Sequence, residues 1–365
     1  MKFSISKEAF LDALNHVQHV VSNRATLPIL SNVLIEAVDG KLKLTTTDLD
    51  VGVSGSVAAE VEKEGSTTLP VKKLVSIVRE LPAAEVEVSV DGKNHASIKS
   101  GPSFFKVIGL GVDEFPPLPS FDEANEFKIS QATLLDAIKK TAYAVSSDET
   151  RYVLNGIYVS FREGKMTFVA TDGRRLAMVD NDLEFPASHE TDIIVPSKAI
   201  NELQRMLGTE GDAVVHLSGN QISFEVGESI IVSKLIEGNY PNYKQVIPGE
   251  RKERVTINRE EFLSTVRRVS LLTSESSNSV KLTFSKGNID VQANSKDIGE
   301  AEESVVADYD GDEMAIAFNP EFLMAPLKNL SEESVYLDLI DGMSPGVVRV
   351  DGSFLYVIMP MRVTA

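Results

Sequence analysis

Apolar residues along this chain follow two spacings, and the two alternate. Short segments in which every second residue is apolar are typical of β-strands, whereas apolar residues three and four positions apart are typical of helices. Phe10, Leu14, Val17 and Val21 mark the first helical pattern. We therefore predict strands separated by six helices, which cover residues 7–22, 70–81, 130–143, 196–207, 258–272 and 319–330.

Three markers repeat with a period of about 125 residues. The first combines a short strand, a polar capping residue and a helical pattern, as in F-S-I-S-K-E-A-F-L-D-A-L (3–14), F-K-I-S-Q-A-T-L-L-D-A-I (127–138) and V-T-I-N-R-E-E-F-L-S-T-V (255–266). The second is a turn that carries Asp48, Asp172 or Asp297. The third is the start of a second helix in each repeat, at Pro70, Pro196 or Asn319. Proline is compatible with such a start, because the first turn of a helix tolerates it.

The repeat predicts three tandem domains, over residues 1–120, 127–245 and 253–365, with linkers near 116–119 and 245–253. Each predicted helix has one apolar stripe, which must pack against a sheet. The fold class is therefore α+β, with antiparallel sheets. The order strand, helix, strands, helix, strands suggests a further duplication within each domain.

Composition excludes several classes of protein. The 365 residues include no cysteine, which rules out disulfides, cysteine-bound zinc and thiol catalysis, and fits a cytoplasmic protein. The N-terminus lacks an apolar targeting segment, and no phosphate-binding G-x-x-x-x-G-K-[ST] loop occurs. We expect no cofactor and no bound metal. The five histidines are not grouped with cysteines, and His16 and His19 are expected at the surface.

Five motifs resemble the bacterial β sliding clamp family, the β subunits of DNA polymerase III. They are T-L-P-I-L (26–30), R-Y-V-L-N-G (151–156), A-T-D-G-R-R-L-A (170–177), G-N-Y-P-N-Y (238–243) and Y-V-I-M-P-M-R (356–362). The resemblance covers the whole chain. It implies a non-enzymatic processivity factor, three clamp domains per chain, and a head-to-tail homodimer. That ring would have helices inside and sheets outside, encircle double-stranded DNA without sequence preference, and be opened by a separate ATPase.

The resemblance also implies a hydrophobic cleft between the second and third domains. This cleft would receive linear peptides from the replicative polymerase α subunit, the clamp-loader δ subunit, other DNA polymerases, mismatch-repair proteins and ligase. Methionine suits such a site because it repacks around different ligands, and arginine can hold a peptide's carbonyls or carboxylates. The matching residues are Arg151, Leu154, Thr171, Gly173, Arg174, Arg175, Leu176, Pro241, Val246, Asn319, Met359, Pro360, Met361 and Arg362.

The expected ring involves two further sets of residues. The resemblance implies a DNA contact at Arg24, and the other expected DNA contacts are basic residues on the predicted helices: Lys72, Lys139, Lys198, Arg205 and Arg267. The expected dimer interface places Leu271 and Leu272 against Phe105 of the partner subunit, with Lys73 facing Glu300, Glu302 and Glu303. Asp148, Val153 and Gln245 depart from residues found in some family members, and Phe322 could line the cleft or fill the core.

The net charge of −18 argues against a nucleic-acid partner until its distribution is considered. The six predicted helices hold twelve basic and eight acidic residues, which leaves them at +4 and the rest of the chain at −22. A weakly positive helix layer suits a ring around DNA. On composition alone, ordinary solvent-exposed helix faces explain these charges as well as a DNA-facing layer does.

Without the resemblance, plainer interpretations of the same residues remain. A-T-D-G-R-R-L could be only a hairpin turn, and V-I-M-P-M only a core strand. Asp48 and Asp172 could be a carboxylate pair in a hydrolase, although a turn role is favoured because one lies in each domain. The three functional hypotheses are therefore a processivity clamp, an enzyme, and a peptide-collecting scaffold that never encircles DNA.

Overall fold

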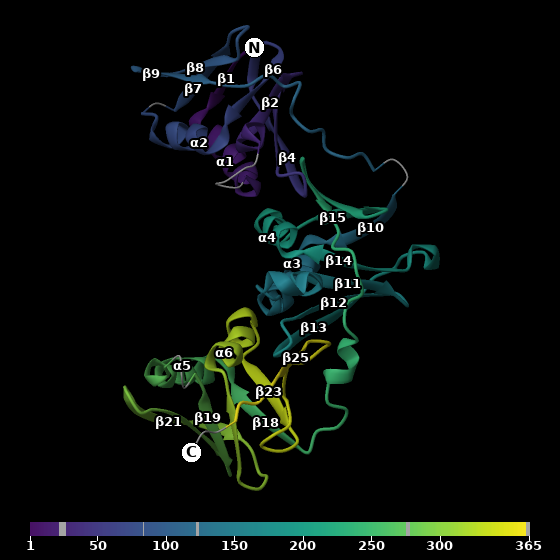
Figure 1. Cartoon of the computed structure of the whole chain (residues 1–365), viewed down its shortest axis with the longest axis vertical. Helices are drawn as coiled ribbons and strands as arrows, with labels where there is room; N and C mark the ends of the chain where they lie inside the picture. Colours follow the sequence, from purple (N-terminus) through teal and green to yellow (C-terminus); the bar gives the residue numbers. More distant parts are fainter. Residues whose placement is uncertain (22–26, 83, 122–123, 275–277, 363–365) are drawn as a thin grey trace. The chain divides into compact units, whose positions relative to one another are not determined.

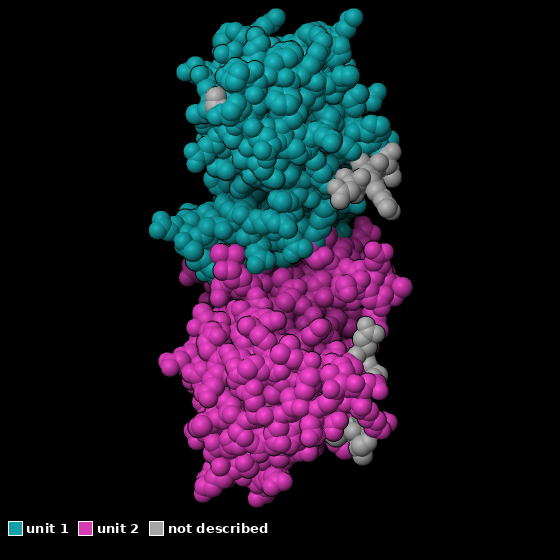
Figure 2. Space-filling model, turned by 90° about the vertical axis from the view of Figure 1, so that its left-hand side faces the viewer, with its two compact units in different colours: residues 1–134, 198–235 teal, residues 135–197, 236–365 magenta. Residues whose placement is uncertain are grey.

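The computed structural model describes residues 1–21, 27–82, 84–121, 124–274 and 278–362. The chain divides into two compact units, shown in Figure 2. Unit 1 contains residues 1–134 and 198–235, and unit 2 contains residues 135–197 and 236–365. The middle repeat of the sequence contributes to both units.

Within the described residues, one order of elements occurs six times: a strand, a helix, then three strands, with β5 added in the first copy (Figure 1). The first two copies are β1 (Lys2–Ser6), α1 (Lys7–Val17), β2 (Asn32–Val38), β3 (Lys41–Thr47), β4 (Val51–Ala58) and β5 (Glu60–Lys63), then β6 (Gly65–Pro70), α2 (Val71–Glu80), β7 (Glu85–Val90), β8 (His95–Ser100) and β9 (Ser103–Ile108). The next two are β10 (Asn125–Ser130), α3 (Gln131–Thr141), β11 (Gly156–Arg162), β12 (Lys165–Thr171) and β13 (Arg175–Asp182), then β14 (Thr191–Pro196), α4 (Ser197–Met206), β15 (Asp212–Ser218), β16 (Gln221–Val226) and β17 (Ser229–Lys234). The last two are β18 (Glu253–Asn258), α5 (Arg259–Val269), β19 (Val280–Ser285), β20 (Asn288–Ser295) and β21 (Gly299–Asp308), then β22 (Met314–Phe318), α6 (Pro320–Asn329), β23 (Ser334–Leu339), β24 (Gly346–Arg349) and β25 (Leu355–Ile358).

The predicted helices form where their capping residues place them. The Ser6 hydroxyl accepts a hydrogen bond from the Ala9 N–H at 3.2 Å, and the side-chain amide oxygen of Asn258 accepts one from the Glu261 N–H at 3.0 Å. Such bonds satisfy N–H groups that have no partner within the first helical turn. The observed helices contain the same twelve basic and eight acidic residues as the predicted ones.

Several predicted helix limits were wrong. Pro70 and Pro196 end strands β6 and β14 rather than opening a helix, so α2 and α4 begin one residue later. Both prolines face a ladder partner, Asn32 for Pro70 and Gly156 for Pro196, and their fixed φ suits this strand-to-helix corner. The first helix ends at Val17 and continues only as a 3-10 turn over Gln18–Val20.

Unit 1 contains two antiparallel sheets. One has the order β5-β1-β7-β8-β9, and the other has the order β10-β15-β16-β17-β4-β3-β2-β6. Helix α1 packs against α2 and against β3 and β4, with Phe10 and Leu14 fully buried. The pairing of β4 with β17 joins strands of the first and second sequence repeats into one sheet, which we call the first junction.

Unit 2 contains one long antiparallel sheet, with the order β14-β11-β12-β13-β25-β24-β23-β18-β21-β20-β19-β22. The pairing of β13 with β25 joins the second and third repeats, and we call it the second junction. Helix α5 packs against α6 and against β18, β20 and β21. Among the described residues, no helix combines the length and the apolar character needed to cross a bilayer.

Candidate functional site

The second junction brings most of the predicted cleft residues together. Strand β13 pairs with β25 through Arg175 opposite Ile358 and Leu176 opposite Val357. The pairing continues past the strand end, since the Met359 N–H donates to the Arg174 carbonyl at 3.0 Å. The Met361 N–H then donates to the Ala317 carbonyl at 2.7 Å, so the C-terminal segment bridges β13 and β22.

A tight turn between β12 and β13 shapes one side of this junction. The Asp172 carboxylate accepts hydrogen bonds from the Arg174 and Arg175 N–H groups, at 2.9 and 3.1 Å. Gly173 has a φ of +85°, and a Cβ there would lie 3.0 Å from the Arg151 Nη1 atom. The backbone conformation therefore favours glycine at this position, and the end of the Arg151 side chain packs against it. The turn role predicted for Asp172 matches these contacts.

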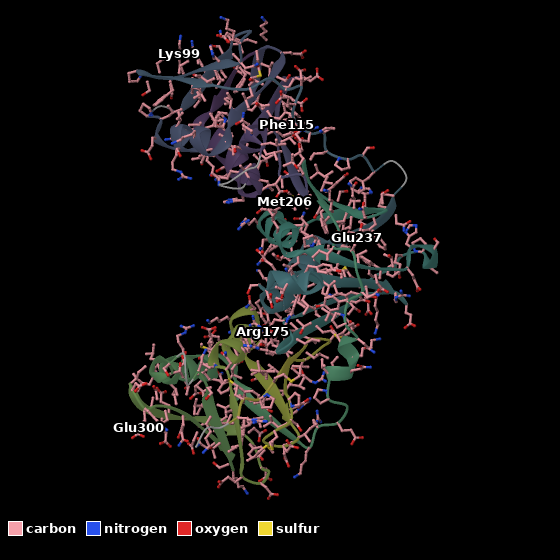
Figure 3. The ribbon with its side chains drawn as sticks, viewed as in Figure 1. Lys99, Phe115, Arg175, Met206, Glu237 and Glu300 are labelled. Atoms are coloured by element: carbon pink, nitrogen blue, oxygen red, sulfur yellow. The ribbon has the colours of Figure 1, made fainter. Side chains whose placement is uncertain are left out.

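Arg175 connects this turn to helix α6 (Figure 3). Its Nε donates to the Asp172 carboxylate at 3.0 Å, and both side chains are mostly buried. Its guanidinium carbon lies 4.4 Å from the centre of the Phe322 ring, a cation–π contact. The Tyr356 hydroxyl donates to the Phe322 carbonyl at 2.7 Å. These contacts hold the start of α6 against β13 and β25.

The 3-10 turn over Glu149–Leu154 lies against the same loop. The Arg151 Nη1 donates to the Asp172 carbonyl at 3.2 Å, and Leu154 is buried. Asp148 caps this turn by accepting hydrogen bonds from the Thr150 hydroxyl and N–H, at 2.6 and 3.0 Å. The bond from the Thr150 hydroxyl, followed by that from its N–H, lowers the pKa of Asp148. Asp148 therefore stays ionised and has a structural role here.

The predicted cleft residues differ in how far they are exposed to solvent. Met359, Met361 and Val246 expose 37%, 38% and 40% of their surface, so these apolar side chains are available to a ligand. Leu154 and Leu176 are buried and can only support the surface. The side chain of Asn319 accepts hydrogen bonds from Glu321 and Phe322 as the cap of α6. The remaining exposed members are Arg151, Gly173, Arg174, Pro241 and Arg362.

Several aromatic residues beneath this surface were not selected from the sequence. Tyr240 and Tyr243 pack with Ile247 against a buried cluster that includes Leu176 and Val357, and the Tyr158 and Tyr240 rings stack at 5.0 Å. The two tyrosines in the linker segment G-N-Y-P-N-Y-K-Q-V-I (238–247) were the available signal. Burial raises the pKa of Tyr243 to about 12 and raises that of Tyr240 further. These phenols stay neutral, so they serve as packing groups and not as acids or bases at neutral pH.

The predicted DNA contacts fall into two groups. Lys72, Lys139 and Arg267 are exposed on α2, α3 and α5. Lys198 instead forms an ion pair with Asp48 and donates to the Val20 carbonyl at 2.8 Å, while Arg205 is exposed but pairs with the buried Glu202. Arg24 lies outside the described residues.

Phe105 and the three glutamates of the predicted interface lie on two strand edges, one in each unit. Phe105 is on β9, the last strand of its sheet, together with the exposed Phe104 and Ile108. Lys73 is exposed on α2. In unit 2, β21 pairs with β18 only at Ala307 and Asp308, which leaves Glu300, Glu302 and Glu303 on a stretch bonded to β20 alone.

The apolar residue beside that stretch is Leu271, which exposes 75% of its surface on the turn after α5, and Leu272 is partly buried next to it. Arg268 donates to the Glu303 carboxylate at 2.6–3.1 Å, and this bond lowers the pKa of Glu303.

The described residues contain no group of three or more histidine, aspartate or glutamate side chains placed to hold a metal ion. His16 and His19 are exposed, as predicted, and line a pocket with Asp12 and Glu202.

Comparisons with known proteins cover the whole chain. Models of the DNA polymerase III β subunit match its N-terminal domain at residues 1–119, its central domain at 128–242 and its C-terminal domain at 244–362. The β sliding clamp of Chlamydia muridarum is 37% identical over 362 residues, which cover 99% of each chain.

Two crystal structures cover 100% of both chains with a TM-score of 0.93. One is the DNA polymerase sliding clamp of Bacillus subtilis, which is 31% identical. The other is the sliding clamp of Bartonella birtlesii bound to griselimycin, which is 37% identical. The predicted succession of three tandem domains of this fold is confirmed, whereas the exact domain limits stay predictions.

Proposed function

Because this chain belongs to the DNA polymerase III β subunit family of sliding clamps, as its motifs predicted, we propose that it forms a dimeric ring that encircles DNA and tethers the replicative polymerase. The family consists of non-catalytic processivity factors, so the chain is not an enzyme. The hydrolase hypothesis is thereby excluded. The choice between a ring and a scaffold rests on the two sheet edges.

The two edges carry the proposal because they complement each other. An unpaired strand edge with apolar side chains is a template for pairing with another chain. Strand β9 offers Phe104, Phe105 and Ile108, and β21 offers Val306, with Leu271 nearby, as exposed apolar groups. Lys73 on one side and Glu300 and Glu302 on the other add opposite charges. A head-to-tail dimer would pair β9 of each chain with β21 of its partner.

The helices supply the proposed DNA-facing surface. Their net charge is +4, on a chain of net charge −18. Lys139 and Arg267 are exposed, and among the described residues neither forms an ion pair. Exposed cations of this kind attract phosphates without reading sequence, and salt screens them over about 8–10 Å. Weak attraction of this kind would keep the ring free to slide.

The second junction is the proposed docking site for partner peptides from the polymerase α subunit, the clamp-loader δ subunit and repair proteins. Its exposed methionines and valine can pack around different apolar side chains. Arg151 and Arg174 at the margin can bond peptide carbonyls. Tethering there would raise the polymerase's effective concentration at the primer end.

Retention on DNA tests the ring directly. Loaded onto nicked circular DNA by a clamp loader, the protein should stay bound through gel filtration in high salt and dissociate once a restriction enzyme cuts the circle. Leu272→Asp, which places a charge at the proposed interface, should give monomers in sedimentation and no retention on either form. Equal retention on circular and linear DNA would leave the scaffold hypothesis instead.

A further inference from the structure

Three arginines surround one buried aspartate on the sheet of unit 2. Arg254 lies opposite Asp338 in the β18–β23 ladder and donates to both carboxylate oxygens, at 2.6 and 2.8 Å. The Arg349 Nε lies 3.2 Å from the same carboxylate, and the Arg251 Nη1 lies 3.9 Å from it. The Asp338 side chain is only 8% exposed, whereas that of Arg251 is 51% exposed.

A cavity of about 280 Å³ opens beside this cluster, and we call it the arginine pocket. Its lining residues are Pro248, Gly249, Glu250, Arg251, Arg254, Asp338, Ile340, Pro345, Val347 and Arg349. Each guanidinium has five N–H donors, and one carboxylate cannot engage the donors of three. The lining is therefore net positive, on a chain of net charge −18, and retains donors for a second anion.

The pocket lies on the sheet face that carries the second junction's apolar cluster. Val347 lines the pocket, pairs with Val357 and belongs to the cluster that contains Leu176. Strand spacing and rise place the Val347 Cα within roughly 10 Å of the Met359 Cα. Arg254 and Asp338 alternate with Val255 and Leu337, which are buried in the core where α5 packs against β18. The pocket thus faces away from the helices proposed to meet DNA.

We propose that the arginine pocket binds a carboxylate side chain in an acidic segment that flanks a partner peptide docked at the second junction. The inference rests on the proposed docking function. Guanidinium groups match a carboxylate's two oxygens, and the small cavity with its proline and valine walls suits one side chain. A phosphate dianion fits less well, because Asp338 and Glu250 also line the pocket.

Three peptides test this inference. The first is the clamp-binding peptide of the replicative polymerase alone. The second and third extend it, at either end, through a six-residue Gly-Ser spacer to four glutamates or four glutamines; such a spacer reaches about 13 Å. At low salt, at least one glutamate peptide should bind about tenfold tighter than its glutamine counterpart. A ratio of this size is expected for one pair of charge-assisted hydrogen bonds. The difference in affinity should shrink in 0.5 M NaCl, because salt screens the charges.

Variants make the test specific. R251Q/R349Q leaves the Arg254–Asp338 pair in place and should remove the glutamate advantage while the unextended peptide binds as before. Arg162→Gln, at another exposed arginine paired with Asp192, is the matched control and should change nothing. Equal binding of both extended peptides, or an advantage that survives R251Q/R349Q, would overturn the inference.

Competition separates carboxylate from phosphate. If 10 mM inorganic phosphate removes the glutamate advantage at matched ionic strength while 10 mM acetate does not, the pocket is a phosphate site and the carboxylate assignment is wrong. Failure of the unextended peptide to bind would instead contradict the docking function.

Discussion

The two junctions have the same strand pairing but differ in the side chains at the ends of the paired strands. At the first, Val51 lies opposite Ser233, and the Lys234 N–H donates to the Asp50 carbonyl; at the second, Arg175 lies opposite Ile358, and the Met359 N–H donates to the Arg174 carbonyl. Lys234 and Met359 therefore occupy equivalent positions. Lys234 forms an ion pair with Asp50 at 3.0 Å, whereas Met359 is left as an exposed apolar side chain beside Arg174.

The aspartates at the equivalent turns of the first two repeats also have different partners. Asp48 pairs with Lys198 from α4, while Asp172 pairs with Arg175 from its own turn. The first junction is further covered by the linker, because Leu118 lies where a side chain on Gly52 would be. The first junction is thus finished with charges and with the chain's own linker, and the exposed Leu49 lines the small pocket of about 100 Å³ that remains there. The other keeps apolar groups at its surface, as a docking site for partner peptides requires.

The largest expected effect comes from giving the second junction the residue of the first. Met359→Lys should weaken binding of the polymerase peptide by about thirtyfold or more, because truncating or charging a central apolar contact costs roughly 2 kcal/mol or more. Isothermal titration calorimetry measures this. Val38→Lys, at an exposed apolar position in unit 1, is the control and should bind normally. Normal binding by Met359→Lys would move the peptide away from this junction.

Removing Arg175 should affect stability as well as binding. Arg175→Met leaves the mostly buried Asp172 carboxylate without its cation and removes the contact with Phe322, so we expect a loss of about 2 kcal/mol in unfolding free energy. Urea midpoints at neutral pH measure the change. Arg175→Lys keeps the charge without the planar guanidinium and should recover only part of the loss. Full recovery would show that the Phe322 contact contributes nothing.

The ion pair at the first junction should contribute less and depend on pH. Partial burial would raise the pKa of Asp48, but the hydrogen bond from Lys198 and those from the Val51 and Asp50 N–H groups outweigh it, and the pKa is lowered. A lowered folded-state pKa gives stability that is present above about pH 4, the unfolded value, and lost as the pH falls through the folded value.

Lys198→Met should therefore cost about 1 kcal/mol or less at pH 7, since the pair is partly exposed, and the difference from wild type should shrink at pH 3. Urea midpoints at the two pH values provide the comparison. A difference that stays constant with pH would mean that the lost contribution is packing of the lysine stem.

The smallest effect is expected at the margin of the second junction. Gln245→Arg adds an exposed charge on the linker turn over Tyr243–Val246. Peptides with an acidic residue should bind about threefold tighter, mainly at low salt, because exposed ion pairs are weak and screened. A gain that persists in 0.5 M NaCl would indicate a desolvated contact at this position.

Local patterns in the sequence were sufficient for the helices, the domain repeat and the family. Apolar spacing and the caps Ser6 and Asn258 determine where helices form, and these are properties of neighbouring residues. The helix starts at Pro70 and Pro196 were misplaced because a proline suits both a strand end and a first helical turn.

Contacts between distant residues could not be predicted. The phosphate contact expected of Lys198 came from its place on a helix, but Asp48, 150 positions away, holds its ammonium group. The contact of Arg175 with Phe322 and the tyrosine packing beneath the second junction likewise depend on how β13, β25 and α6 meet. One sequence contains no direct signal of that pairing, and the arginine pocket arises from the same kind of long-range contact.

The central claim is that partner peptides bind the second junction and not the first. A polymerase peptide carrying a photoreactive benzophenone can be cross-linked to the intact protein and the adducts mapped by mass spectrometry. We expect one peptide per chain, with adducts in residues 151–176, 241–246 and 359–362. Adducts centred on residues 47–52, 116–119 or 230–234, or two peptides per chain, would contradict the account.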